Sequence, residues 1–342
     1  MLPRERVRAM LDFQPPDIVC LECHPSTAGM HEHREKLQAL FRDTPHDFGD
    51  FSNLPIPDPD PQFIQPDGSY CELRTDAWGV VWKHLVFGIW GHPEKNPLDD
   101  WAALETWQTP TPPTPSGPEF EVVKESLRQH RETYYLRAGW GSILEVMRAV
   151  RRFEDCMVDL ALNSAEINKV ADMIAEHDRG VMEYYVAAGV DGVQIGDDLG
   201  TQEALMISRD MFRRFFLPRY QYILEPAREA GLDIFFHTCG QVWDLLPDLA
   251  ELGVNALWPQ INLYDWPALR ARCRELGMAI QLHPERSHVM TFGTPEAVTK
   301  HVDDLVAAFR PQEGGSWLYI EIDNGFPWEN VEALFEAVRK YR

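Results

Sequence analysis

The feature that most constrains the fold is a regular alternation of short apolar segments and amphipathic segments in the last two thirds of the chain. The apolar segments predict strands over residues 134–138, 192–196, 233–237, 255–258, 278–283 and 316–322. The amphipathic segments predict helices over residues 119–133, 142–153, 164–188, 208–230, 241–252, 265–276, 294–309 and 328–341. Several helices stop at a glycine (Gly189, Gly231, Gly253 and Gly277), the residue that most readily ends a helix in a left-handed conformation.

The short, almost wholly apolar strands indicate a parallel sheet that is buried on both faces. Six strand–helix units leave room for two more upstream, and residues 18–22 are a candidate strand there. No glycine-rich phosphate loop follows any strand, which disfavours an open dinucleotide-binding sheet. We therefore predict a single (β/α)8 TIM barrel over residues 1–342, in the α/β class. Residues 119–342 form its regular part.

Residues 1–118 are predicted to be irregular excursions from this barrel. Residues 43–69 are rich in Pro, Asp and Phe, which is typical of a long ordered loop. Residues 108–118 contain five prolines and cannot form the interior of a helix. We interpret them as an extended connector across the surface.

Composition narrows the class of function. The net charge of −22 repels phosphate backbones, so nucleic-acid binding is not expected. No apolar run is long enough to predict a membrane span. The N-terminal residues are charged and have no apolar segment behind them, so a cytoplasmic location is expected. Six cysteines in 342 residues are too sparse for a disulfide scaffold.

Functional residues of such barrels lie at the carboxyl ends of the strands. The polar and aromatic side chains found there are Arg137, Trp140, Asp197, Asp198, His237, Cys239, Gln260, His283, Glu321 and Asp323. We expect Asp197, Asp198 and His237 to be catalytic. Contacts to a small-molecule substrate are assigned to Arg137, Trp140, Gln260, His283 and Glu321.

The pair His237 and Cys239 is the most specific of these signals. Residues two apart on an extended segment point to the same side, so an imidazole and a thiolate here can chelate one metal ion, and zinc suits that pair. A third ligand must come from another strand end, and Asp323 and Glu321 on the last strand are the best candidates, followed by His283. The alternative is a buried histidine bonded to the backbone beside a packing thiol.

Two further motifs leave alternatives open. Asp197 and Asp198 follow an apolar strand, where carboxylates are costly unless they are bonded or used. One is expected to act as a general acid or base or to bind a substrate cation, and the alternative is a cap on a turn. Cys20 and Cys23 have a metal-like spacing but no second pair, so we interpret them as structural.

The chain resembles the uroporphyrinogen decarboxylase superfamily, and within it the branch that includes cobalamin-dependent methyltransferases. The resemblance is carried by residues 4–9, 13–17, 76–79, 96–101, 196–202, 236–240, 292–296 and 327–331. It implies a (β/α)8 barrel. It leaves open which of two chemistries the chain performs.

True decarboxylases of this family carry an arginine-containing N-terminal segment that binds substrate carboxylates. The corresponding residues here, 20–29, contain no arginine. The methyltransferase branch uses zinc held by a His-x-Cys pair and a later cysteine. His237 and Cys239 match the pair, whereas the closing strand offers Asp323 and no cysteine.

The resemblance thus implies zinc, a corrinoid carried on a partner protein, and possible homodimers. Three hypotheses follow: methyl transfer, decarboxylation of a porphyrinogen, and a non-catalytic ligand-binding barrel.

Overall fold

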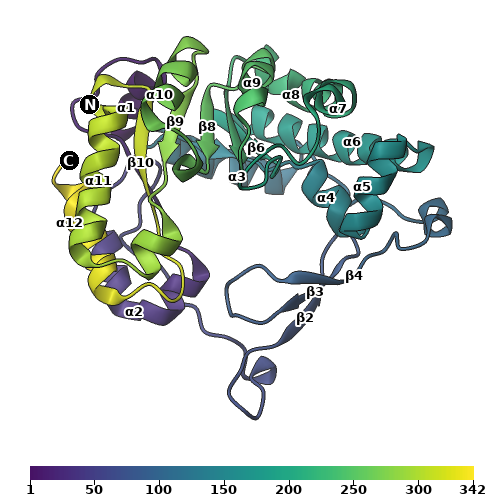
Figure 1. Ribbon diagram of the computed structural model, residues 1–342, viewed down its shortest axis with the longest axis horizontal. Helices are drawn as coiled ribbons and strands as arrows, with labels where there is room; N and C mark the ends of the chain where they lie inside the picture. Colours follow the sequence, from purple (N-terminus) through teal and green to yellow (C-terminus); the bar gives the residue numbers. More distant parts are fainter.

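The computed structural model describes residues 1–342 and contains one curled sheet of seven parallel strands, with helices on its outer face (Figure 1). Its strand order is β1 (Leu21–His24), β10 (Ser316–Glu321), β9 (Ala279–Leu282), β8 (Ala256–Pro259), β7 (Asp233–Thr238), β6 (Gly192–Gly196) and β5 (Arg137–Ala138). This arrangement confirms the predicted α/β, TIM-barrel-like fold. The single-domain interpretation of residues 1–342 stays a prediction.

The helices follow the strands along the chain. They are α1 (Pro3–Leu11), α2 (Thr27–Arg42), α3 (Pro118–Arg131), α4 (Leu144–Val150), α5 (Phe153–Leu162), α6 (Ala165–Ala188), α7 (Arg209–Met211), α8 (Leu217–Glu229), α9 (Leu246–Glu251), α10 (Trp266–Glu275), α11 (Pro295–Phe309) and α12 (Trp328–Arg339). Short 3-10 or π turns lie at residues 61–63, 101–105, 212–216, 243–245, 261–263, 286–291 and 311–313.

Most predicted elements agree with these bounds, but three differ. The helix predicted over residues 142–153 is the shorter α4, because Arg151 is extended, and the helix α5 that follows was not predicted. The predicted strand over residues 134–138 forms sheet bonds only at Arg137 and Ala138. The candidate strand over 18–22 lies slightly later, at Leu21–His24.

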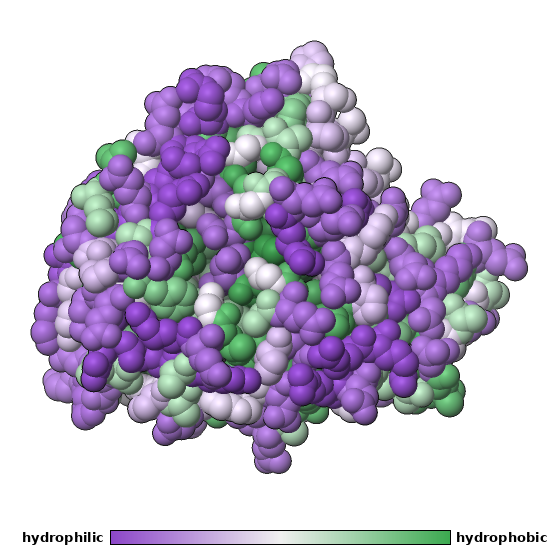
Figure 2. Space-filling view, turned by 90° about the horizontal axis from the view of Figure 1, so that it is seen from above, coloured by the Kyte–Doolittle hydropathy of each residue, from purple (hydrophilic) through white to green (hydrophobic).

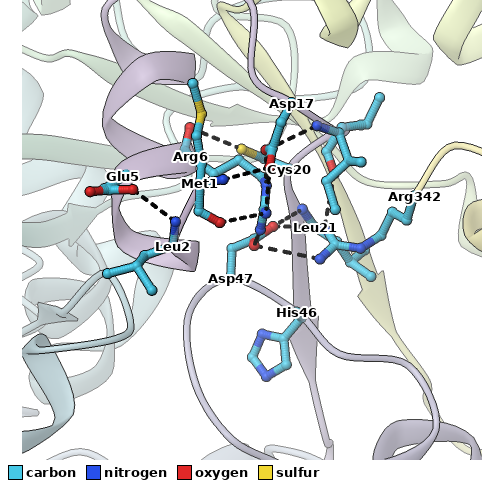
Figure 3. A network of polar contacts seen from close by, with 12 residues as sticks. Met1, Leu2, Glu5, Arg6, Asp17, Cys20, Leu21, His46, Asp47 and Arg342 are labelled. Atoms are coloured by element: carbon cyan, nitrogen blue, oxygen red, sulfur yellow. Dashed lines mark hydrogen bonds and ion pairs between the residues drawn. The ribbon is translucent and has the colours of Figure 1, made fainter.

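The place of an eighth strand, between the edge strands β1 and β5, is held by irregular backbone around Asp47. The Asp47 amide donates to the Leu21 carbonyl at 2.9 Å, and the Tyr135 amide donates to the Asp47 carbonyl at 3.3 Å. The Asp47 carboxylate also accepts from the Leu21 amide at 2.8 Å (Figure 3). An ion pair between Glu22 of β1 and Arg137 of β5 joins the same two edges. Two edge strands and this bridge therefore close the ring.

Helix α1 seals the amino-terminal end of the barrel. Its apolar side chains Val7, Met10 and Leu11 are buried. They belong to one cluster with residues from the strand starts and the interior, namely Cys20, Tyr135, Phe235, Ala256, Ala279 and Trp317. Cys20 and Cys23 are free, buried thiols, as their structural interpretation requires. This end therefore offers no opening to a ligand.

The region predicted to be irregular contains a small antiparallel sheet, which the sequence analysis missed. Its strands are β2 (Glu72–Thr75), β3 (Val81–His84) and β4 (His92–Lys95), in that order. The sheet stands apart from the parallel strands (Figure 1). It is tied back to α4 where the Leu98 amide donates to the Val150 carbonyl at 2.9 Å.

Hydrophilic side chains dominate the face seen in Figure 2, and hydrophobic residues gather near its centre. The excess of acidic over basic residues, 54 against 32, agrees with this polar surface. None of the helices has the length and hydropathy that a membrane crossing requires. The cytoplasmic location stays a prediction.

Candidate metal centre and active-site cavity

The candidate site begins at the end of β7, where His237 and Cys239 point to the same side. Thr238 between them is fully buried, whereas His237 and Cys239 are half-buried, as the two-residue repeat of a strand requires. The His237 Nε2 atom and the Cys239 Sγ atom are 3.5 Å apart. The two side chains therefore converge as the sequence predicted.

Asp198 supplies a third polar group to this pair. It follows β6, which is paired with β7 so that Gly196 lies beside His237. One carboxylate oxygen of Asp198 lies 3.4 Å from His237 Nε2 and accepts a hydrogen bond from the Cys239 amide at 2.9 Å. The potential ligand atoms of Asp198, His237 and Cys239 all lie within 4.8 Å of one another.

The backbone that presents Cys239 is fixed by a close contact between two glycines. Gly240 has a φ of +82°, and a Cβ atom placed there would lie 2.1 Å from the Gly200 carbonyl carbon. The Gly200 amide donates to the Cys239 carbonyl at 3.2 Å. The glycine of the His-Thr-Cys-Gly segment is therefore required both by its backbone conformation and by space.

The other side of the imidazole is also fixed. The Nδ1 atom of His237 lies 3.1 Å from the Trp258 carbonyl oxygen, so Nδ1 is the donor and Nε2 is free to bind a cation. Gln260 accepts from the Gly240 amide at 3.2 Å and is bonded to Gln202. These contacts orient the imidazole before any ligand arrives.

Electrostatics at the three groups favours a cation. Burial disfavours the ionised form of Asp198, but its contact with His237 and the hydrogen bond from the Cys239 amide outweigh it and lower its pKa to about 2. Burial, with the charge of Asp198 next to it, raises the pKa of Cys239 to about 12. A metal ion placed between them would remove this repulsion and hold the thiolate.

The distances fit a tetrahedral zinc site. Zinc–nitrogen, zinc–oxygen and zinc–sulfur bonds of ordinary length place an N and an S ligand about 3.5 Å apart, and an N and an O ligand about 3.4 Å apart. The observed separations are 3.5 Å between His237 and Cys239 and 3.4 Å between His237 and Asp198. One nitrogen, one sulfur and one oxygen ligand leave a fourth position for a substrate, as catalytic zinc sites do.

Asp197 has a different environment from its neighbour. Its carboxylate is buried and accepts hydrogen bonds from the amides of Ile143, Leu144 and Glu145 at 2.7–2.9 Å. Tyr220 donates to it as well. Burial raises the pKa of Asp197 to about 7. The carboxylate thus caps the start of α4, which is the alternative left open for one member of the pair.

A cavity of about 450 Å³ opens beside the three ligand candidates. Its wall combines ends of β7, β8, β9 and β10, and the residues are His237, Cys239, Trp258, Pro259, Gln260, Ile261, Asn262, His283, Pro284, Glu285, Arg286, Ser287 and Glu321. The structure thus brings together His237, Cys239, Gln260, His283 and Glu321, five of the residues assigned to the site.

Glu321 lines the same cavity and is the centre of a second polar group. It lies 3.7 Å from His283 Nε2, 3.8 Å from His24 Nε2 and 3.8 Å from Arg286. Burial lowers the pKa of His283 to about 3, so its ring is neutral, and its Nε2 atom has no hydrogen-bond partner. These groups are suited to bind a polar substrate.

Three assigned residues lie elsewhere. Asp323 pairs with Arg286 and does not reach the His237–Cys239 pair. Arg137 is inside the barrel, paired with Glu22, and its guanidinium lies 4.9 Å from the Phe235 ring centroid. Trp140 lines a neighbouring cavity, with its ring centroid 6.2 Å from that of His237.

Arg286 and His24 also belong to this polar group but were not predicted as site residues. Arg286 begins a π turn after β9, and no local pattern distinguishes it from other surface arginines. His24 closes β1, where its register partner is Glu321 of β10. The position of His24 at the end of a strand is the sequence feature that could have indicated its place in the site.

A protein-family comparison identifies the class. The family described as "Uroporphyrinogen decarboxylase (URO-D)" matches residues 92–341. The chain belongs to the uroporphyrinogen decarboxylase family, which confirms the resemblance drawn from its motifs. A search of curated proteins gives no match.

Solved structures with the same fold include a methyltransferase from Methanosarcina mazei. It is 17% identical, the alignment covers 100% of this chain and 99% of that one, and the TM-score is 0.60. A weaker likeness is found to a B12-independent methionine synthase from Shewanella sp. W3-18-1, with 10% identity, 80% and 75% coverage and a TM-score of 0.43. The first likeness supports the shared fold along the whole chain.

Proposed function

We propose that this chain is a methyltransferase that works with a zinc ion held by Asp198, His237 and Cys239. The observation that carries the proposal is the convergence of one carboxylate oxygen, one imidazole nitrogen and one thiol sulfur beside a cavity. Asp198 takes the place that the sequence analysis gave to Asp323, because Asp323 is paired with Arg286. Zinc, when bound, supplies a Lewis acid that lowers the pKa of a substrate thiol or polarises a methyl ether oxygen.

The residues of the chain have distinct tasks in this proposal. His237, oriented by the Trp258 carbonyl, keeps Nε2 directed toward the ligand position. His283, Glu321 and Arg286 bind the polar part of a small substrate. A corrinoid carried on a separate protein, when bound, would supply or accept the methyl group. This partner is inferred from the family resemblance.

Decarboxylation of a porphyrinogen is the second candidate, because the family takes its name from that reaction. A substrate with several carboxylates needs several cationic anchors. Arg286 is the only lysine or arginine that lines the cavity, and it already faces Asp323 and Glu321. The cavity therefore favours methyl transfer.

A corrinoid assay tests the proposal. Zinc-loaded protein is incubated with methylcobalamin and a panel of small thiols, and with cob(I)alamin and a panel of aryl methyl ethers, while absorbance follows the cobalamin. We expect turnover above the protein-free rate in one arm, lost with a chelator and restored by zinc. Cys239→Ala should lose this activity. Cys71→Ala is the control and should keep it, because Cys71 does not line the cavity. Zinc-independent formation of coproporphyrinogen from uroporphyrinogen would overturn the proposal.

A further inference from the structure

A second cavity, of about 610 Å³, lies next to the metal centre and is lined by four tryptophans. Trp78, Trp82 and Trp90 come from the segment that forms the small antiparallel sheet, and Trp140 follows β5 of the barrel. The excursion therefore folds back to build an aromatic wall beside the active-site cavity. The described methyl-transfer site uses none of these rings.

Two of the four indoles have their hydrogen-bond donors occupied. The Nε1–H group of Trp82 donates to Asp76 at 2.7 Å, and that of Trp140 donates to the Ser142 hydroxyl at 3.0 Å. Trp82 and Trp90 meet edge to face with ring centroids 5.1 Å apart. With these donors occupied, what remains for a ligand is the negative face of the ring quadrupole.

The charged residues in the wall all have one sign. Asp76, Glu145 and Asp178 line the cavity together with the neutral or protonatable His177, and no lysine or arginine does. One carboxylate oxygen of Glu145 is buried without a hydrogen-bond partner, while the other bonds Arg148. An unpartnered buried carboxylate oxygen is costly, and a cation in the cavity would offset that cost.

The protein itself already places a cation on this cluster. The guanidinium of Arg74 lies 5.8 Å from the ring centroid of Trp90, and Arg74 is the cross-strand partner of Trp82 in the small sheet. A cation over an indole face gains about 0.5–2 kcal/mol, depending on how far it is removed from water. A cationic ligand that fits among several indoles gains this interaction energy from each of them.

We propose that the tryptophan-lined cavity binds a quaternary ammonium group. Its N-methyl groups pack against indole faces and need no hydrogen-bond acceptor, and its positive charge is balanced by Glu145 and Asp178. A primary ammonium would be held by N–H donation to these carboxylates, whereas a quaternary ammonium also covers indole faces with its methyl groups. The inference stands on this cavity alone and goes beyond the proposed methyl transfer.

A pair of probes of equal shape tests the role of charge. Calorimetric titration compares choline with 3,3-dimethyl-1-butanol, in which carbon replaces the ammonium nitrogen. We expect choline to bind at least tenfold more tightly than the neutral compound. Equal affinities of the two compounds would overturn the proposal. So would the absence of heat from choline up to about 20 mM, a concentration that detects a site with a millimolar dissociation constant.

Tryptophan variants locate the binding. Trp90 and Trp140 are 65% and 48% exposed, so their replacement by leucine leaves the core intact. Trp90→Leu and Trp140→Leu should each weaken choline binding at least fivefold, and Glu145→Gln should weaken it by a similar factor. Trp243→Leu is the matched control, since Trp243 is 38% exposed and lies outside the cavity. Unchanged affinity in both cavity variants contradicts the proposal.

A metal-site variant separates this inference from the proposed function. His237→Ala should leave the affinity for choline unchanged while it removes zinc-dependent activity. Loss of choline binding in His237→Ala, with the unfolding temperature unchanged, would assign the ligand to the metal centre and overturn the aromatic site.

Discussion

Both ends of the barrel contain buried polar groups, but the hydrogen bonding of these groups differs between the two ends. At the amino-terminal end, Asp191 is bonded by Arg4, Arg8 and Arg131. Asp47 is bonded there by Arg6 and Arg342 (Figure 3). At the carboxyl-terminal end, polar atoms such as His283 Nε2 and Glu145 Oε1 are buried with no partner.

This difference separates fold from function. A buried carboxylate with several arginines around it is fully satisfied, and it joins segments far apart in the sequence. An unpartnered polar atom beside a cavity keeps its bonding capacity for a ligand. We therefore expect substitutions at the closed end to change stability, and substitutions at the open end to change binding.

The largest expected effect is the loss of the metal when a ligand is removed at the open end. Cys239→Ala should bind essentially no zinc and lose zinc-dependent activity, because two protein ligands are too few for a catalytic site. Its unfolding free energy, measured in urea without added metal, should stay within about 1 kcal/mol of the parent, since Cys239 is only partly buried. Retention of a full zinc equivalent would show that the thiol is not a ligand.

The next largest effect is expected at the closed end. Asp191→Asn should destabilise the protein by roughly 2–3 kcal/mol, because it removes the buried anion that three partly exposed arginines bond. Urea unfolding measures the loss, and zinc content at low temperature should not change. A loss below about 1 kcal/mol would refute the structural role of this network.

A smaller effect is expected where the glycines cross beneath Cys239. Gly240→Ala should cost more than about 1 kcal/mol and weaken zinc binding, because the new Cβ collides with Gly200. Gly231→Ala is the matched control: Gly231 also has a positive φ, of +67°, but a Cβ there meets no atom within 4 Å. If both variants bind zinc equally well, the crossing does not position the thiol.

The smallest effect is a dependence of stability on acid pH. Burial opposes the ionisation of Asp191, but its hydrogen bonds with arginines outweigh it and lower its pKa to about 2, below its ordinary value of 3.8. A carboxylate with a lowered pKa stabilises the fold above about pH 4, and this contribution is lost as the pH falls toward 2. Urea midpoints at pH 5 and pH 3 should therefore differ more for the parent than for Asp191→Asn.

The sequence predicted the regular part of the barrel well, because its strands are apolar and its helices end at glycines. The His237–Cys239 pair was also predictable, since their relation depends only on the two-residue repeat of a strand. The same repeat predicts that Asp197 and Asp198 point to opposite sides. Which of them points toward His237 depends on the α4 amides that bind Asp197, and these amides are distant in sequence.

Contacts between distant segments could not be predicted. No local pattern indicates that Asp47 replaces an eighth strand, because its partners Leu21 and Tyr135 lie far from it in the chain. The tryptophan-lined cavity depends on how residues 72–95 fold back onto α4. Asp323 was predicted to be a metal ligand because it follows a strand. Its pairing with Arg286 depends on the turn over residues 286–291, which no sequence motif indicates.

The metal content of the purified parent protein tests the central claim most directly. After incubation with zinc and removal of the excess, elemental analysis should find close to one zinc per chain, and Cys71→Ala should retain it. Less than a tenth of an equivalent, with no gain on adding zinc, would contradict the account of Asp198, His237 and Cys239 as a metal centre.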